Sequence, residues 1–152
     1  MSIFTSMNTT GSALTAQRLR MDVISSNIAN VDTTRAKQVN GEWEPYRKKS
    51  VVLQEKTGSF NTYLDKAMGN ASGSTGNGVR VTEIKEDTET EFKLVYDPTN
   101  IDADENGYVK QSNVDLLKEM VDLISATRSY EANVTVFNAN KSMLMKALEI
   151  GK

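Results

Sequence analysis

Apolar side chains recur at helical spacing near both ends of the chain. In residues 3–31, a repeat of seven falls on Met7, Leu14, Met21 and Ile28. In residues 114–150, the same repeat falls on Leu116, Leu123, Tyr130, Phe137 and Leu144. Further apolar residues flank the second repeat, and they include Leu117, Met120, Val121, Ile124, Val134 and Leu148. Because this spacing keeps one face of a helix apolar, both segments are predicted to form long amphipathic helices.

The C-terminal helix has recognisable start and stop signals. Asn113 is a good N-cap, Asp115 lies in the predicted first turn, and Gly151 follows the last apolar residue. At a rise of about 1.5 Å per residue, this helix would be roughly 55 Å long. The N-terminal helix is shorter, so part of the C-terminal stripe is expected to contact another copy of the chain or a related chain.

Polar residues interrupt both apolar ends. Residues 25–34 place Asn27 and Asn30 at the exit of the first helix. Asparagine tolerates left-handed geometry and satisfies free carbonyl groups, which predicts a capped corner. In the second helix, polar residues lie in or beside the apolar face at Arg128, Tyr130, Glu131, Asn133, Asn138 and Asn140. They either fix the register of a helix seam or form a solvated face.

The middle of the chain has the alternation of strands rather than the spacing of helices. Residues 49–54 form a short extended piece, and apolar positions alternate within residues 79–96. Two or three short antiparallel strands are therefore expected. Asp97-Pro98 predicts a turn after the last strand. The four glycines between residues 69 and 78 favour a flexible surface loop.

Composition limits the classes of function. The 152 residues are 38% hydrophobic and 25% charged, which suits one soluble domain. A net charge of -2 gives no general attraction to nucleic acid, and no apolar run is long enough to span a membrane. The first 30 residues lack the apolar core of a secretory signal. The absence of cysteine and histidine excludes disulfides, thiol chemistry and histidine-ligated metals.

The best candidate for a metal site is residues 102–109, which match the first half of a calcium-binding EF-hand loop. The matching ligand positions are Asp102, Asp104 and Asn106. The final position of that motif is a bidentate glutamate, and here it is Asn113. The pattern therefore favours an Asx-rich turn in which Gly107 has a positive φ. A calcium-binding module that uses residues 102–107 is the alternative function.

Two other charged clusters are interpreted as solvated surface. The acidic residues between Glu83 and Glu91 alternate with threonine, as at the edge of a sheet. Arg47, Lys48 and Lys49 are too few to define a polyanion site. No catalytic, cofactor-binding or metal-binding residue is assigned, and the chain is not expected to be an enzyme.

Two motifs lie within the predicted helices. One covers residues 13–34 and is centred on Ser26-Asn27-Ile28-Ala29-Asn30-Val31, and the other covers residues 113–133. Together they resemble the flagellar basal-body rod and hook protein family. The positions that match the family motifs are Asn27, Ala29, Asn30, Glu119, Met120, Arg128, Tyr130, Glu131 and Asn133. The short middle, with Asp97-Pro98 and residues 102–109, is similar to that of the family's proximal-rod members.

The resemblance implies an α+β fold in which long N- and C-terminal helices pack as an antiparallel coiled-coil-like pair, with a small β-rich middle domain. Residues 1–36 and 113–152 would form the helical core of the rod domain. Residues 37–112 would form the middle domain, with the flexible loop at 69–78. The assembly interface would then be the apolar repeat, which consists of Met7, Leu14, Met21, Ile28, Leu116, Leu123, Tyr130, Phe137 and Leu144.

The resemblance also implies a function in assembly. The chain would be a structural subunit of the bacterial flagellar proximal rod, in the periplasmic part of the basal body. It would self-assemble through its terminal helices into a helical drive shaft that transmits torque, after type III export. The implied partners are copies of itself, other flagellar rod proteins, and the junction to the membrane ring and export apparatus. No cofactor, nucleic acid or direct membrane span is expected.

Overall fold

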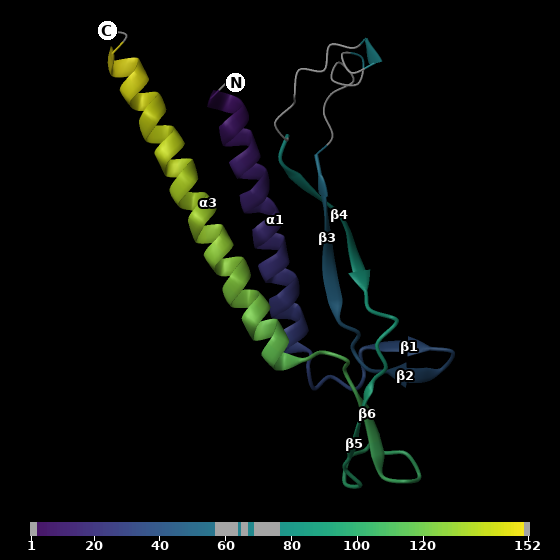
Figure 1. The fold of residues 1–152 in the computed structure, drawn as a ribbon. Helices are drawn as coiled ribbons and strands as arrows, with labels where there is room; N and C mark the ends of the chain where they lie inside the picture. Colours follow the sequence, from purple (N-terminus) through teal and green to yellow (C-terminus); the bar gives the residue numbers. More distant parts are fainter. Residues whose placement is uncertain (1–2, 57–63, 65–66, 69–76, 151–152) are drawn as a thin grey trace. The chain divides into compact units, whose positions relative to one another are not determined.

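Two long helices and six short strands make up the part of the chain that is described. The computed structural model describes residues 3–56, 64, 67–68 and 77–150. The helices are α1 (Ile3–Ala29) and α3 (Leu116–Ile150), with the strands between them in sequence (Figure 1). Both predicted helices are confirmed. The first ends two residues earlier than predicted, and the second begins two residues later.

The first turn of α3 is capped by a residue other than the predicted one. Asp115 Oδ1 accepts hydrogen bonds from the N–H groups of Leu117 and Lys118, at 3.1 and 3.4 Å. Asp115 is therefore the N-cap, and the prediction that Asn113 caps this helix is wrong. Gly151, the predicted stop signal, lies outside the described residues.

The chain divides into two compact units, and each unit contains a piece of both helices. The first unit comprises Met1–Leu19, Val52–Glu83 and Ala126–Lys152, and the second comprises Arg20–Val51 and Ile84–Ser125. In the first unit, the Asn140 side-chain amide of α3 donates to Ser6 Oγ of α1 at 3.0 Å. In the second unit, Arg20 of α1 pairs with Asp122 of α3 at 3.4 Å. Within each unit the helices are antiparallel neighbours, which confirms the predicted packing of the terminal helices.

The strands form three two-stranded sheets, which confirms the α+β class. One antiparallel pair is β1 (Lys37–Val39) with β2 (Glu42–Glu44). Another is β5 (Lys93–Tyr96) with β6 (Tyr108–Gln111). The third sheet pairs β3 (Lys49–Glu55) with β4 (Val79–Glu86). The prediction of two or three strands was too low, since the described residues contain six.

Local turn chemistry explains where the strands stop. Asn40 and Gly41 have φ angles of 53° and 91°, the left-handed pair that a tight hairpin between β1 and β2 requires. Residues 79–96, predicted as strand from their alternation, form two strands with a turn between them. In that turn, Asp87 Oδ1 accepts hydrogen bonds from the N–H groups of Glu89 and Thr90, at 3.0 Å each.

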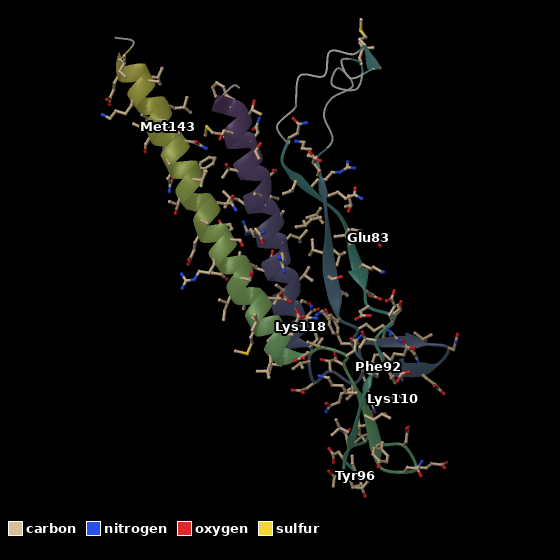
Figure 2. All side chains as sticks on the ribbon, viewed as in Figure 1. Glu83, Phe92, Tyr96, Lys110, Lys118 and Met143 are labelled. Atoms are coloured by element: carbon tan, nitrogen blue, oxygen red, sulfur yellow. The ribbon has the colours of Figure 1, made fainter. Side chains whose placement is uncertain are left out.

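The buried core is small, and polar side chains are prominent in it. The buried apolar side chains are Ala16, Val23, Ile24, Tyr46, Val109, Val114 and Ala126. The buried polar side chains are Thr10, Asn27, Ser112, Asn113, Glu119 and Asn140. Many larger apolar side chains of α3 stay exposed instead (Figure 2). Among the described residues, neither helix combines the length and hydropathy that a membrane span requires.

Candidate functional site

A buried polar cluster joins α1, α3 and the segment that enters β3. We call it the Asn27 cluster, and its members are Asn27, Tyr46, Lys48, Lys49 and Glu119. The Asn27 side-chain oxygen accepts hydrogen bonds from Tyr46 Oη and the backbone N–H of Lys49, both at 3.0 Å. The Asn27 amide nitrogen donates to the Lys49 carbonyl at 2.8 Å and to Glu119 Oε2 at 2.9 Å. This one side chain of α1 thereby satisfies groups from α3 and from the segment that enters β3.

The carboxylate of Glu119 brings a charge into this buried site. Glu119 is 1% exposed, and its second oxygen, Oε1, forms an ion pair with Lys48 Nζ. Removing one partner of such a buried pair typically costs about 3–5 kcal/mol, because the other charge is left uncompensated. The pair therefore favours one register of α3 against α1 and the chain before β3.

Asn113 makes a second set of buried hydrogen bonds just before α3. Its side-chain oxygen accepts from the backbone N–H of Lys48 at 2.7 Å. Its amide nitrogen donates to the carbonyls of Asp87 and Thr90, at 3.2 and 3.3 Å. These bonds explain why Asn113 does not act as the N-cap, since its side chain is already committed to the strand connections.

The two asparagines at the exit of α1 have different roles. The Asn30 amide donates to the Ser26 carbonyl at 2.8 Å, and Thr33 Oγ1 donates to Asn30 Oδ1 at 3.2 Å. The predicted capped corner is therefore confirmed at Asn30. Asn27 instead turns into the protein, a role that helix-exit chemistry alone does not predict.

Asp102, the first residue of the calcium-loop pattern, is bonded to the segment after α1. Arg35 Nε donates to Asp102 Oδ1 at 2.6 Å, and Thr34 Oγ1 donates to Oδ2 at 2.8 Å. These hydrogen bonds, that of Arg35 foremost, hold the pKa of the Asp102 carboxyl below its usual value. The same hydrogen bond raises the pKa of the Arg35 guanidinium.

This arrangement gives the 102–107 loop a structural role. A guanidinium cation and a hydroxyl occupy the carboxylate oxygens that calcium would need. Gly107 has the expected positive φ, at 78°. In the described part of the chain, no group of three or more acidic side chains is arranged to hold a metal ion. The loop is an Asx-rich turn fastened to the corner after α1.

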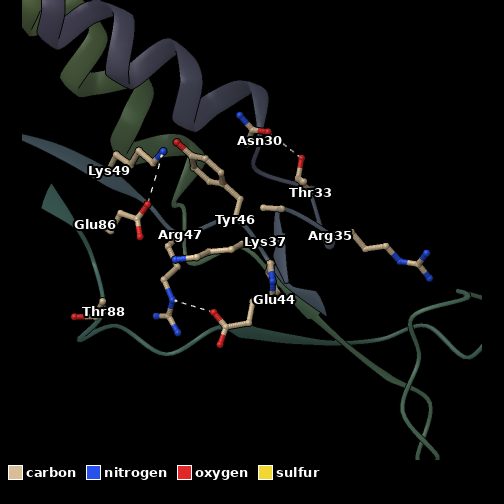
Figure 3. Close-up of a pocket in the computed structure, with 12 residues that line it drawn as sticks. Asn30, Thr33, Arg35, Lys37, Glu44, Tyr46, Arg47, Lys49, Glu86 and Thr88 are labelled. Atoms are coloured by element: carbon tan, nitrogen blue, oxygen red, sulfur yellow. Dashed lines mark hydrogen bonds and ion pairs between the residues drawn. The ribbon is translucent and has the colours of Figure 1, made fainter. Parts of the chain in front are cut away.

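An open pocket beside this corner contains charged side chains of both signs (Figure 3). Arg47 Nε lies 3.8 Å from Glu44 Oε2, and Lys49 Nζ lies 3.8 Å from Glu86 Oε1. Arg47 and Lys49 are thus paired with neighbouring carboxylates that also line the pocket. Such ion pairs position the strand connections, and they supply neither an activated nucleophile nor a general base.

The predicted interface repeat is mostly half-buried within the chain. Its half-buried members are Met7, Leu14, Met21, Ile28, Leu123, Tyr130, Phe137 and Leu144. Leu116 is the member that the structure leaves exposed. A role of these residues in contacts between subunits stays a prediction.

A second apolar stripe on α3 faces away from α1. We call it the outward stripe, and it consists of Leu117, Met120, Val121 and Ile124. Leu117, Val121 and Ile124 are 75%, 66% and 61% exposed. They share one helix face by their spacing, opposite the face from which Glu119 and Asp122 reach α1. Most of the sequence repeat thus lies on the inner side of this helix, while four of its flanking residues, Leu117, Met120, Val121 and Ile124, form the outer side.

Three of the remaining family-motif positions, Arg128, Glu131 and Asn133, make contacts within α3. Arg128 Nη1 pairs with Glu131 Oε2 at 3.0 Å, with both side chains largely exposed. The Asn133 amide donates to the Ser129 carbonyl at 2.8 Å. Asn27 and Glu119 are therefore the motif positions that the structure brings together, while Arg128 and Glu131 stay on the surface.

Comparisons with known proteins cover both ends of the chain and its full length. The family described as "Flagella basal body rod protein" matches residues 7–37, and "Flagellar basal body rod FlgEFG protein C-terminal" matches residues 105–150. A Bacillus subtilis protein named flagellar basal-body rod protein FlgC is 65% identical over 152 residues, which is 100% of both chains. Proteins of the same name from Borreliella burgdorferi and Salmonella typhimurium are 43% and 45% identical. They cover 99% and 93% of this chain, and 98% and 92% of their own lengths.

Proposed function

The chain belongs to the FlgC family of flagellar basal-body rod proteins, and we propose that it builds the proximal part of the rod through contacts between its terminal helices. As a member of this family it is a structural, non-enzymatic protein of bacterial motility. The proposal concerns how it assembles. Many copies would stack helically into a drive shaft that transmits torque.

The observation that carries this proposal is the exposed apolar stripe on the side of α3 that faces away from α1. The inner side of α3 packs on α1, while the outward stripe leaves four large apolar side chains in water. Because α1 covers one side of this helix, a second apolar face that stays exposed is expected to be covered by another body. Exposed apolar patches of this kind mark protein contacts, and in a rod subunit the neighbouring subunits are the natural contacts.

The Asn27 cluster supports the mechanical side of the proposal. Polar groups buried in a helix seam fix its register, at the cost of some stability. Here the same cluster also includes the backbone of Lys49, at the start of β3. A load applied to one helix would be passed to the other and to the strands without slippage of the register.

The domain organisation and the partners follow from the same proposal. Residues 1–36 and 113–152 would form the rod core, and residues 37–112 the domain between them. The half-buried apolar repeat of the terminal helices would contact the terminal helices of neighbouring copies. Other rod proteins, the junction to the membrane ring and the export apparatus would be the remaining partners, in the periplasmic part of the basal body.

A pair of lysine substitutions tests the role of the terminal helices. Val121→Lys should reduce the amount of the chain in purified basal bodies about tenfold or more, because a charge would be buried between subunits. Trp43→Lys removes an apolar side chain of similar exposure from β2 and should leave incorporation unchanged. Full incorporation of the Val121 variant, with swimming motility intact, would contradict the proposal.

A further inference from the structure

The sequence contains three Asn-Gly pairs, at residues 40–41, 77–78 and 106–107. In such a pair the backbone nitrogen of the glycine can attack the side-chain carbonyl carbon of the asparagine. A five-membered succinimide ring forms, the side-chain nitrogen leaves as ammonia, and water then opens the ring to aspartate or isoaspartate. Glycine permits this attack because it has no Cβ to crowd the nitrogen and because its backbone rotates freely. The structure places the three pairs in different surroundings.

The pair at Asn40-Gly41 is open to this reaction. Both residues are exposed in the turn between β1 and β2, and a Cβ built on Gly41 would meet no atom within 4 Å. The Gln38 amide donates to the Gly41 carbonyl at 3.2 Å. Among the described residues, no acceptor binds the Gly41 N–H and no group binds the Asn40 side chain. Neither reacting group therefore has to leave a partner before the ring closes.

The backbone of this hairpin also favours the closed ring. Asn40 has a φ of 53°, and hairpin turns of type I′ and type II′ share a positive φ at the first central residue. The ring joins the Asn40 side chain to the Gly41 nitrogen and confines ψ of Asn40 to about −120°, as at that position in type II′. Rotation of the single peptide between Asn40 and Gly41 reaches this geometry, and glycine tolerates the new φ. The pairing of Val39 with Glu42 can persist meanwhile.

The pair at Asn106-Gly107 is exposed at its asparagine but held at its glycine. The Gly107 N–H donates to the Asp104 carbonyl at 2.8 Å, and the Gly107 carbonyl accepts from the Asp97 N–H at 3.0 Å. A Cβ on Gly107 would lie 3.0 Å from Tyr96 Cε2, so the backbone is closely packed as well. The Gly107 nitrogen must leave its acceptor before it attacks, which alone should slow the reaction about fivefold.

The pair at Asn77-Gly78 is held by its contacts with the first helix and with the end of β3. Asn77 is half-buried, and the Gly78 carbonyl accepts from the Lys56 N–H at 2.8 Å. A Cβ on Gly78 would lie 3.3 Å from the Thr9 Cα of α1. These contacts fix the backbone at Gly78 and oppose the rotation that ring closure needs.

We propose that Asn40 is a deamidation site, selected over Asn77 and Asn106 by its open hairpin turn. Each conversion replaces a neutral amide with a carboxylate, two residues before the exposed Glu42. An isoaspartate also lengthens the backbone of the turn, which disturbs the register of β1 with β2. The hairpin would thus record the age of a chain that persists in an assembly. The inference concerns this hairpin alone and does not rest on the proposed function.

Mass spectrometry of the purified full chain tests the site. Trypsin cleaves after lysine and arginine, and it places the three asparagines in separate peptides, residues 38–47, 67–80 and 94–110. The folded chain is incubated at mildly alkaline pH, which favours loss of the attacking N–H proton, and the acid form at each position is followed over time. Asn40 should convert at least about fivefold faster than Asn106. Equal rates, or faster conversion of Asn77 or Asn106, would overturn the proposal.

A denatured sample separates the effect of the hairpin from that of the sequence. In guanidinium chloride, Asn40 and Asn106 should convert at similar rates, because both are followed by glycine and neither keeps its native surroundings. A ratio that stays the same in the folded and the denatured chain would overturn the hairpin as the cause of the selection.

A substitution in the turn tests the attacking group. Gly41→Ala should slow conversion of Asn40 about tenfold, because a Cβ hinders the attack and opposes the positive φ. Conversion of Asn106 in the same molecules should not change. Gly11→Ala, at a glycine with no atom within 4 Å of its Cβ position and no asparagine before it, is the matched control. An unchanged rate at Asn40 in the Gly41 variant would exclude attack by the Gly41 nitrogen and overturn the proposal. Since none of these measurements needs a rod, such a failure would leave the proposed function standing.

Discussion

At the scale of single residues, Asn27 shows how much one buried amide can organise. Its oxygen and nitrogen take part in four hydrogen bonds, to Tyr46, to Glu119 and to both backbone groups of Lys49. The side chain is fully buried, so water cannot replace a lost partner. The polar character of this position is a requirement of the fold, whatever additional contacts the rod provides.

Asn27→Ala should lower the free energy of unfolding by about 3 kcal/mol, because several buried polar groups would lose their partner at once. Chemical denaturation of the purified full chain measures this change. Asn138→Ala, at an exposed asparagine of α3, is the matched control and should change stability by less than about 0.5 kcal/mol. Similar effects of the two substitutions would show that the cluster does not hold the helices.

Asp102 gives a prediction about pH. Its pKa lies below the usual 3.8 because Arg35 and Thr34 donate hydrogen bonds to the carboxylate. A carboxyl with a lowered pKa stabilises the fold above its unfolded-state pKa, and the contribution is lost as pH falls through the folded-state pKa. The free energy of unfolding should therefore decrease at pH values below about 4, and protonation of Asp102 should account for part of this decrease.

Arg35→Gln should raise the pKa of Asp102 back towards 3.8, because the hydrogen bond from the Arg35 guanidinium is the largest cause of the lowered pKa. A carboxyl titration followed by NMR measures the pKa directly. Asp102→Asn should make stability less sensitive to acid below about pH 4. A pKa of Asp102 that is unchanged by Arg35→Gln would exclude the proposed cause.

At the scale of elements, the sequence predicts periodic structure well and local caps less well. The repeat of seven located both helices to within two residues, because helical spacing is a direct consequence of burying one face. It did not separate Asn113 from Asp115 as the N-cap, since both residues favour that position. Asp115 caps the helix because the Asn113 side chain is already hydrogen-bonded to the backbone of Lys48, Asp87 and Thr90, which are distant in sequence.

Asp115→Ala should destabilise the start of α3 by about 1 kcal/mol, because two N–H groups lose their acceptor. Amide hydrogen exchange at Leu117 and Lys118 should accelerate in this variant. Asn113→Ala should cost more, about 2 kcal/mol, and its effect should extend to the amide of Lys48. Faster exchange confined to Leu117 and Lys118 in the Asn113 variant would restore Asn113 as the cap.

The strands show a second limit of prediction at this scale. The Asn40-Gly41 pair is a strong hairpin signal, yet β1 and β2 have three residues each, too few for alternation to be recognised. The Asn27 cluster could be predicted only in part from the sequence. Family resemblance selected Asn27 and Glu119, but their hydrogen bond connects residues at opposite ends of the chain and follows from the tertiary fold.

At the scale of the whole molecule, the chain combines the buried Asn27 cluster with the exposed apolar side chains of the outward stripe. The buried charges fix which way the terminal helices meet, and the exposed apolar side chains leave α3 incomplete as an isolated helix. Sequence alone could identify the apolar residues. Their division into an inner face and the outward stripe required the contacts of α1 with Glu119 and Asp122.

The most direct measurement of this account is the accessibility of the outward stripe before and after assembly. Val121→Cys should react rapidly with a water-soluble maleimide in the purified chain, where Val121 is 66% exposed. In intact basal bodies the same thiol should be protected, while Trp43→Cys serves as the reference for a residue outside the helices. Labelling of Val121→Cys at the same rate in both states would contradict the claim that the outward stripe builds the rod.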